Sequence, residues 1–301
     1  MGTPIQRHPR RSRSPRYQVY LRISNRLFMS VCVLFTLLIL AILMLVVLYL
    51  LSKGFTHIRL DFFTKVEIAE GMKGSPGGMA HALVGTGMLI AMASLLGTPL
   101  GMFAGIYLSE YSANSWLGAP TRFIADVLSG VPSIVVGIVG YELVVVPIGH
   151  ANGYAGALAL AFIMIPIVAR TTEEMLRLVP DSYREASMAL GATKAWTILK
   201  VVLPSASGSV VTGIMLAVAR VAGETAPLLF TAGASRLMSL NPDQPFPSLT
   251  VAIFQFATGP YKDQQQLAWA GILILIGLIF LLNLMVRLTV YRLQSRPIAR
   301  A

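Results

Sequence analysis

Residues 185–204 read EASMALGATKAWTILKVVLP and separate two long apolar stretches of the chain. At their start, Ser182 and Glu185 stand three residues apart, which is the spacing of a capping box that begins a helix. Gly191 suits the left-handed residue that ends a helix. The helix between these signals has only about two turns, and helices shorter than about 12 residues are marginal in water. We therefore expect tertiary contact to hold this polar segment in place.

The same stretch predicts a second short helix, which Thr193 caps and which ends before Pro204. On the first helix, Ala186, Ala189 and Leu190 follow the spacing i, i+3, i+4 and share one apolar face. Small side chains on one helix face allow close insertion into a groove of another surface. The sequence therefore predicts a docking element between the two apolar stretches.

The composition places the whole chain in the membrane class. Only 12% of its 301 residues are charged and the mean hydropathy is +0.70, whereas an average soluble domain carries about 25% charged residues. We predict an all-α integral membrane protein with six transmembrane helices of about 20 residues each. The six apolar segments cover residues 27–51, 82–108, 123–148, 153–169, 207–232 and 267–291.

The basic residues predict the orientation of these helices. The first 26 residues hold seven arginines and no acidic residue, which places the N-terminus in the cytoplasm by the positive-inside rule. Six spans return the C-terminus to the same side. We attribute the net charge of +11 to this topology and to contact with membrane lipid, and we expect no nucleic acid partner.

The expected organisation has four parts. Residues 1–26 form a cytoplasmic Arg-rich arm that is disordered or lies on anionic lipid. Residues 27–51 form the first transmembrane helix. Residues 82–291 form a compact transmembrane domain with a cytoplasmic loop at residues 171–206, and residues 292–301 form a cytoplasmic tail.

A second loop, at residues 233–266, is long for a connection between two helices. It contains an apolar run at residues 249–256 and is rich in proline. We predict a short re-entrant or interfacial helix there, with a variable surface loop as the alternative.

Two charges lie four residues apart inside the fifth apolar segment. A charge at the centre of a bilayer costs about 3 kcal/mol, so Arg220 and Glu224 are functional candidates. They can pair with each other across one helix turn. Alternatively, Arg220 offers its planar guanidinium to a tetrahedral oxyanion, and Glu224 holds that guanidinium or rejects anions that have no proton to donate. The residue pattern leaves both interpretations open.

Another charged cluster follows the fourth apolar segment. Arg170 can pair with Glu173 and Glu174 at i, i+3 and i+4, and the cluster then serves as an anchor or as a gate. In the third segment, Asp126 and Glu142 either line a pathway or satisfy the backbone of a kinked helix.

The sequence lacks the residue patterns that nucleotide binding, metal binding and catalysis require. No Gly-x4-Gly-Lys-Ser/Thr motif occurs, so we expect ATP and Mg²⁺ to be bound by another polypeptide. The four histidines are scattered and Cys32 is the one cysteine, so no metal site and no cofactor of this chain are predicted. No nucleophile–base constellation is present, which favours a non-catalytic protein over a membrane enzyme.

The stretch that begins at Glu185 resembles the signature of ABC importer permeases, which reads Glu-Ala-Ala, three residues, Gly, nine residues, Ile-x-Leu-Pro. Ser187 replaces the second alanine and Val201 replaces the isoleucine. The resemblance implies the type I (MetI-like) permease fold, with coupling helices in residues 171–206 that fit a cleft on a cytoplasmic ATPase subunit. The implied ATPase-coupling residues are Glu185, Ala186, Ser187, Gly191, Leu203 and Pro204.

A second resemblance concerns the cargo. Arg220 followed by Gly-Glu-Thr-Ala-Pro-Leu-Leu at residues 223–229 looks like the PstA family of phosphate permeases, and residues 131–135, 170–174 and 265–271 look like the same family. The resemblance implies import of inorganic phosphate into the cytoplasm across a bacterial plasma membrane by alternating access. The implied substrate-pathway residues are Arg220, Glu224 and Thr225.

The resemblance also implies partners. A PstC-like second permease subunit would complete a heterodimeric pore, two PstB-like ATPase subunits would drive it, and a PstS-like extracytoplasmic protein would deliver phosphate. Two alternatives remain open at this point. A permease for another oxyanion, such as sulfate or molybdate, would carry the same coupling loop. An ion-coupled secondary transporter would use Glu142 or Glu224 as a proton relay, and it leaves the capped loop unexplained.

Overall fold

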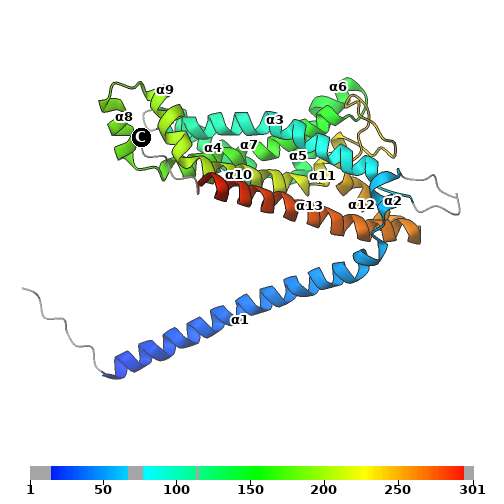
Figure 1. The fold of residues 1–301 in the computed structure, drawn as a ribbon, viewed down its shortest axis with the longest axis horizontal. Coiled ribbons are helices and arrows are strands. Elements are labelled where there is room, and N and C mark those ends of the chain that lie inside the picture. The colour runs from blue at the N-terminus through cyan, green and yellow to red at the C-terminus, as the bar shows by residue number, and fades with distance from the viewer. Residues whose placement is uncertain (1–14, 67–76, 113–114, 295–301) are drawn as a thin grey trace, which may run out of the picture. The chain divides into compact units, whose positions relative to one another are not determined.

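The computed structural model describes residues 15–66, 77–112 and 115–294, and within these ranges every regular element is a helix (Figure 1). The all-α prediction is confirmed. The long helices are α1 (Pro15–Gly54), α3 (Ala80–Glu110), α7 (Gly153–Arg177), α10 (Leu203–Ala222) and α13 (Lys262–Gln294). The shorter ones are η1 (Phe55–His57), α2 (Leu60–Thr64), α4 (Gly118–Gly130), α5 (Ser133–Gly140), η3 (Tyr141–Val145), α6 (Val146–Ile148), α8 (Asp181–Ala189), α9 (Lys194–Thr197), η4 (Ile198–Val202), α11 (Ala226–Thr231) and α12 (Leu249–Thr258).

Five of the described helices are long and apolar enough to cross a membrane, and a bent pair makes six if it is counted as one span. The pair consists of α4 and the helical stretch from α5 to α6, and it turns by 102° at its break. Val131 is extended at the break, because Pro132 disfavours helical geometry in the residue before it. The prediction of six spans is confirmed on that count, with the third span strongly bent.

The chain divides into two compact units, residues 1–52 and 53–301. In the first unit, α1 starts at Pro15, so the described residues 15–26 are helical, and the disordered alternative predicted for the arm is wrong for them. The other alternative, that the arm lies on anionic lipid, stays a prediction. Proline favours the first position of a helix, and no glycine or further proline follows before residue 54. The rest of the predicted arm, residues 1–14, and most of the predicted tail, residues 295–301, lie outside the described residues.

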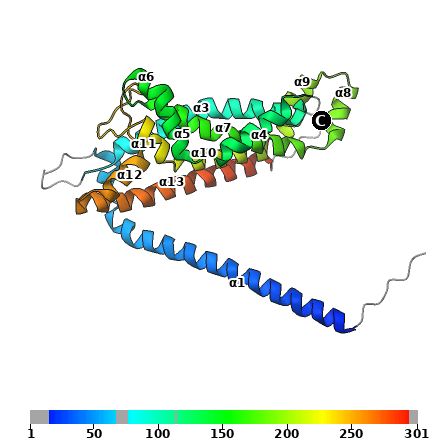
Figure 2. The same cartoon turned by 180° about the vertical axis from the view of Figure 1, so that it is seen from behind.

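Helices α3 and α7 form the most extensive helix pair of the second unit and lie side by side in Figures 1 and 2. Gly97, Gly101 and Gly105 recur every four residues along α3 and let the two backbones approach closely. A Cβ atom on Gly101 would lie 2.7 Å from Cβ of Val168, and one on Gly105 would lie 2.6 Å from the carbonyl oxygen of Ala169. This close fit leaves no room for a side chain between α3 and α7 along the glycine row.

Two π-helical turns precede prolines of this unit. The turn η4 comes directly before the helical stretch that contains Pro204, and η3 comes before Pro147. Proline has no backbone N–H and its ring clashes with the carbonyl of residue i−4, so a wider turn lets the helix continue past it. Residues 194–222 form one continuous helical span. The prediction that the second short helix ends before Pro204 is therefore wrong.

The predicted fifth span, residues 207–232, is interrupted after α10. Helix α10 ends at Ala222, and α11 begins at Ala226 with Pro227 in its first turn, where a missing N–H costs nothing. Helix α11 packs on α5, the second half of the bent span. A Cβ atom on Gly137 of α5 would lie 2.6 Å from Cα of Pro227. The two interrupted spans thus meet closely through their second halves.

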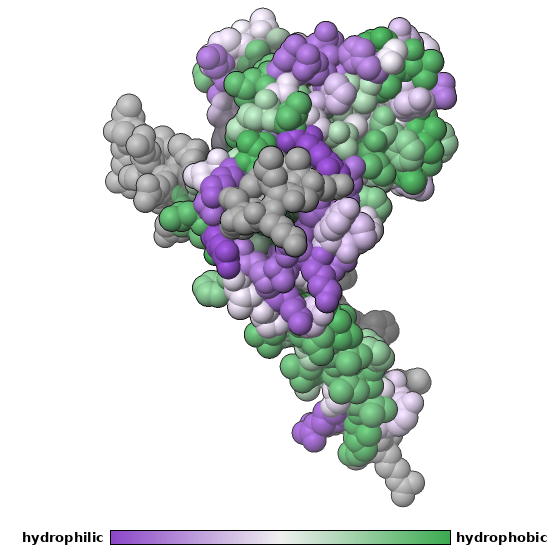
Figure 3. Space-filling model, turned by 90° about the vertical axis from the view of Figure 1, so that its right-hand side faces the viewer, coloured by the Kyte–Doolittle hydropathy of each residue, from purple (hydrophilic) through white to green (hydrophobic). Residues whose placement is uncertain are grey.

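The loop at residues 233–266 contains α12, so the prediction of a short helix there is confirmed. With 10 residues, α12 is too short to cross a bilayer. Its side chains Leu249, Ile253 and Phe256 are buried, and the helix packs against α13 and α3. Figure 3 looks onto the side where α2, α12 and the start of α13 lie, and hydrophilic residues gather there. We call this the α12 end of the second unit and the opposite one the α8 end.

Candidate functional site

The segment between α7 and α10 forms a helix, a turn and a second helix at the α8 end (Figure 1). Helix α8 begins at Asp181 with Pro180 at its N-cap, and no side chain caps it. The predicted capping box of Ser182 and Glu185 is therefore wrong, since Ser182 already lies in the first turn. Asp181 instead places a negative charge in that turn, where the helix dipole favours it.

The turn after α8 has the predicted geometry. Gly191 has a φ of +87°, a left-handed conformation that favours glycine. The N–H of Gly191 donates to the carbonyl of Met188 at 2.9 Å, and that of Ala192 donates to the carbonyl of Ser187 at 3.2 Å, which is a Schellman motif. The hydroxyl of Thr193 accepts from the N–H of Trp196 at 3.3 Å. The predicted helix stop and the predicted second cap are both confirmed.

Ser187 fixes the two short helices against each other. Its hydroxyl lies 2.9 Å from that of Thr197, and both side chains are buried. The position at which this sequence departs from the Glu-Ala-Ala pattern thus makes a specific hydrogen bond. An alanine there could not make this bond.

The predicted apolar face of α8 is exposed in the single chain. Ala186 and Ala189 are exposed, and Leu190 is 89% exposed. Glu185 is exposed as well, and Trp196 of α9 is 53% exposed. This exposure agrees with the predicted docking face, whose occupant stays a prediction. At the start of α10, Pro204 is exposed and Leu203 is half-buried.

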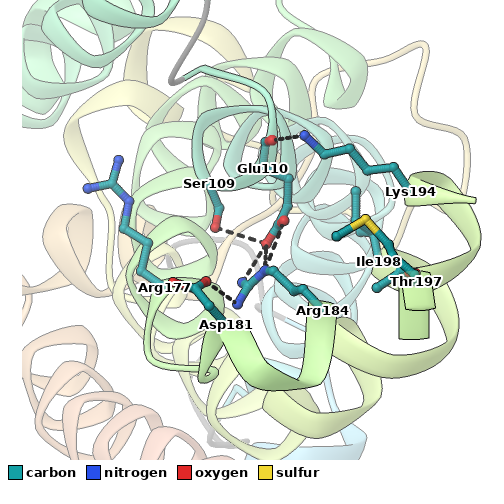
Figure 4. A pocket seen from close by; sticks show the side chains of 9 residues that line it. Ser109, Glu110, Arg177, Asp181, Arg184, Lys194, Thr197 and Ile198 are labelled. Atoms are coloured by element: carbon teal, nitrogen blue, oxygen red, sulfur yellow. Dashed lines mark hydrogen bonds and ion pairs between the residues drawn. The ribbon is translucent and has the colours of Figure 1, made fainter. Parts of the chain in front are cut away.

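Glu110, the last residue of α3, fastens this segment to the helix bundle (Figure 4). Arg184 of α8 donates hydrogen bonds of 2.7 and 3.2 Å to the two carboxylate oxygens of Glu110. These side chains are only 15% and 5% exposed, respectively. Hydrogen bonding to Glu110 raises the pKa of Arg184 above its ordinary value, so the guanidinium stays charged. Lys194 of α9 donates to the carbonyl oxygen of Glu110 at 2.5 Å and lies 4.5 Å from the centre of the Tyr111 ring.

Arg184 also holds the end of α7. It donates to the carbonyl oxygens of Val179 at 2.7 Å and Leu176 at 2.9 Å, and to Asp181 at 3.3 Å. One guanidinium therefore joins α3, the end of α7 and α8. Neither Glu110 nor Arg184 was among the residues that the sequence pattern predicted as functional. An acidic residue at the polar end of an apolar segment, opposite a basic loop, is the signal that could have found the pair.

A pocket of about 500 Å³ lies at this junction (Figure 4). Its charged walls are formed by Arg177, Arg184 and Lys194, and by Glu110 and Asp181. Each of the three cations already has an acceptor within the chain. The charges of the pocket are thus satisfied internally, and the geometry favours a mechanical junction over an anion-binding site.

Glu173 of α7 is the centre of a second ion-pair network. Its carboxylate is buried and lies 2.6 Å from Arg122, 3.0 Å from Arg170 and 2.7 Å from Arg177. Arg122 also donates to the carbonyl oxygen of Leu108 at 2.9 Å, which joins α4 to α3. The predicted Arg170–Glu173 pair is present, and it belongs to a cluster that ties three helices together.

The remaining acidic residues that the sequence singled out in the third and fourth spans are Glu174, Asp126 and Glu142. Glu174 is exposed and makes no ion pair with any residue that the structure describes, so the predicted Arg170–Glu174 pair is absent. Asp126 was predicted to line a pathway or to satisfy the backbone of a kinked helix. It instead lies 2.6 Å from Arg170, and this ion pair supports the bent third span. Glu142 is exposed in the π turn η3.

Arg220 and Glu224 flank the end of α10. Arg220 is exposed, Glu224 is half-buried, and within the described ranges the two side chains make no ion pair. The helix ends at Ala222, so the predicted i, i+4 geometry is interrupted between them. The backbone at Glu224 is held by Thr250 of α12, whose hydroxyl donates to its carbonyl oxygen at 2.9 Å. Thr225 is half-buried in the break.

The sequence matches the family of binding-protein-dependent transport system inner membrane components over residues 97–295. Several phosphate transport system permease proteins named PstA are similar to it. The protein of Yersinia pestis is 48% identical over 78% of this chain and 79% of its own length. That of Haemophilus influenzae is 43% identical over 79% and 84%. A probable PstA of Methanocaldococcus jannaschii is 41% identical over 69% and 73%.

Solved structures support the fold independently. The chain is similar to the MetNI methionine ABC transporter in an inward-facing conformation, with a TM-score of 0.60 at 20% identity, covering 75% of this chain and 99% of that one. An amino acid ABC transporter gives a TM-score of 0.52 at 17% identity, covering 73% and 93%. The predicted type I, MetI-like permease fold of a multi-pass membrane protein is thereby confirmed. The chain belongs to the family of binding-protein-dependent transport system inner membrane components, and within it to the PstA permeases.

Proposed function

We propose that this chain is the transmembrane permease subunit of an ATP-driven importer that moves inorganic phosphate into the cytoplasm by alternating access. The observation that carries the proposal is the similarity to PstA phosphate permeases at 41–48% identity over most of the chain. The similar region is long enough to include the segment of α8 and α9 as well as the break after α10. The proposal has two parts, a contact with the ATPase at α8 and a contact with phosphate at Arg220.

The ATPase side of the proposal rests on the exposed face of α8. Residues 171–206 act as the coupling segment, and Ala186, Ala189 and Leu190 insert into a cleft of an ATPase subunit. Glu185 lies on the rim of that contact. Ser187 and Gly191 shape the turn, and Leu203 and Pro204 begin the span that the segment moves. ATP and Mg²⁺ are bound and used by the ATPase subunits, so this chain is a non-catalytic subunit with no cofactor of its own.

The cargo side rests on Arg220. A guanidinium presents two parallel N–H donors that match the geometry of a phosphate, and each charged hydrogen bond is stronger than a neutral one. Arg220 is exposed in the single chain, at the break of a membrane span. A second permease subunit would enclose that break in a shared pathway. Glu224 and Thr225 line the same break and orient the anion.

The remaining assignments follow from this assembly. We infer two PstB-like ATPase subunits, a PstC-like permease subunit and a PstS-like phosphate-binding protein outside the membrane. The seven arginines among the first 26 residues support an orientation with both termini in the cytoplasm of a bacterial cell and the chain in the plasma membrane. The α8 end then faces the cytoplasm and the α12 end faces out.

Reconstitution tests this function. The complex of all four kinds of subunit is placed in liposomes, and uptake of radiolabelled phosphate is followed with and without ATP. We expect uptake that requires ATP and the binding protein, resists ionophores, and is not reduced by a tenfold excess of sulfate or molybdate. Uptake driven by an ion gradient without ATP would contradict the proposal, and inhibition by sulfate or molybdate would reassign the cargo.

A further inference from the structure

Glu110 holds the coupling segment on both sides of its central turn. Arg184 precedes Gly191 on α8, and Lys194 follows it on α9. Arg184 binds the carboxylate of Glu110 and Lys194 binds its carbonyl oxygen. The two short helices are therefore fixed to a single residue of α3. Displacement of the segment must either carry Glu110 with it or break this joint.

Helix α3 is able to transmit such a displacement. It has 31 residues, about 46 Å at 1.5 Å per residue, and runs through the second unit. Its glycine row at positions 97, 101 and 105 packs directly on α7, so that the two helices move together. The interior of such a contact is close-packed and resists sliding. A displacement at Glu110 is therefore transmitted to the opposite end of the α3–α7 pair.

That other end is fastened to the segment that leads into α12. The N–H of Leu249 donates to the hydroxyl of Thr86 on α3 at 2.7 Å, and both groups are buried. The N–H of Gly153, the first residue of α7, donates to the carbonyl oxygen of Pro242 at 2.7 Å. A Cβ atom on Gly85 would clash with the carbonyl oxygen of Pro247, so α3 and this segment also touch closely.

From these three sets of contacts we propose that Glu110 is a positioning residue, through which the coupling segment drives the α3–α7 pair and, with it, residues 242–249 at the α12 end. In this proposal, the Glu110–Arg184 ion pair connects the coupling segment to α3, and α3 carries the displacement along its length. The Thr86–Leu249 hydrogen bond then connects α3 to the start of α12. Because Thr250 holds the carbonyl of Glu224, the same movement reaches the break after α10. The inference rests on the proposed function, since it names the route by which ATP use opens and closes the phosphate pathway.

The test measures how much phosphate enters per ATP hydrolysed. Glu110→Gln and Glu110→Ala are introduced into the full complex, which is purified and reconstituted as above. Asp181→Asn is the matched control, because Asp181 also contacts Arg184 but lies on α8 itself and is 87% exposed at its side chain. Subunit stoichiometry, ATP hydrolysis and phosphate uptake are measured on each preparation.

We expect both Glu110 variants to assemble and to hydrolyse ATP within twofold of the wild type, while phosphate uptake per ATP falls at least fivefold. Asp181→Asn should keep the wild-type ratio. An unchanged ratio in both Glu110 variants would overturn the inference. So would a parallel loss of ATP hydrolysis and uptake, or failure of both variants to assemble, because each of these outcomes marks a merely structural ion pair. A wild-type complex without ATP-dependent uptake would instead overturn the proposed function.

Discussion

Nε of Arg122 on α4 lies 2.6 Å from the carboxylate of Glu173 on α7, although the two residues are 51 positions apart in the chain. Two more arginines, Arg170 and Arg177, contact the same carboxylate. The contact explains how the bent third span is held against α7. The Glu173 side chain is 2% exposed, whereas those of Arg122 and Arg177 are 29% and 53% exposed, so the carboxylate is shielded from solvent and the arginines reach it.

Replacement of Glu173 by glutamine should destabilise the protein. Removing one partner of a buried ion pair costs about 3–5 kcal/mol, and exposure of the arginines reduces this to about 2 kcal/mol. The loss of stability is measured by unfolding the protein in detergent with heat or denaturant. Glu174→Gln is the control, since Glu174 is exposed on the next position of the same helix and should change stability by less than about 0.5 kcal/mol. Equal effects of the two substitutions would contradict the assignment of Glu173 as the anchor.

Replacement of Gly191 by alanine should strain the turn of the coupling segment. A left-handed conformation costs a residue with a Cβ atom about 1–2 kcal/mol. We expect the strain to appear as faster proteolysis between α8 and α9 and as at least a threefold loss of ATP-driven uptake. Gly87→Ala is the matched control, because Gly87 lies in α3 without a positive φ, and a Cβ atom there would meet nothing within 4 Å beyond its own turn of helix. A Gly191 variant indistinguishable from the Gly87 variant would show that the turn geometry is dispensable.

Replacement of Leu190 by glutamate should weaken the hold on the ATPase without unfolding the chain. Leu190 is 89% exposed, so the substitution removes no internal contact, and a charge in an apolar docking cleft is costly to desolvate. We expect about tenfold weaker association, which corresponds to about 1.4 kcal/mol. Co-purification with the ATPase subunits checks this. The control Leu237→Glu, at a residue 74% exposed in the loop before α12, should leave the yield unchanged. Undiminished co-purification of the Leu190 variant would place the docking surface elsewhere.

Local signals predicted the turn at Gly191, the cap at Thr193 and the short helix at residues 249–256, because each depends on residues that are close in the chain. The start of α8 was predicted wrongly. There, a proline and an acidic first turn take the place of the side-chain cap, and the long-range bond from Arg184 to Glu110 supplies the tertiary contact that a short helix needs.

Side-chain partners that are far apart in the chain could not be predicted from the sequence. Glu110 and Arg184 are 74 positions apart, and although an acidic helix end opposite a basic loop is a signal, it does not specify which two side chains pair. The i, i+4 rule failed for Arg220 and Glu224, because α10 ends at Ala222, between the two residues. The same rule failed for Arg170 and Glu174, since Glu173 and Asp126 both accept from Arg170. Helical spacing shows which side chains can meet, and tertiary packing decides which of them do.

Phosphate uptake by complexes that carry Arg220→Gln tests the central assignment most directly. The substitution keeps a polar, hydrogen-bonding side chain, although a shorter one, and removes the charged fork, so assembly and basal ATP hydrolysis should persist. Loss of one charged hydrogen-bonding group corresponds to about 1.5–3 kcal/mol. We therefore predict that ATP-dependent uptake of radiolabelled phosphate into proteoliposomes falls at least tenfold. Uptake equal to that of the wild-type complex would contradict the assignment of Arg220 to the phosphate pathway.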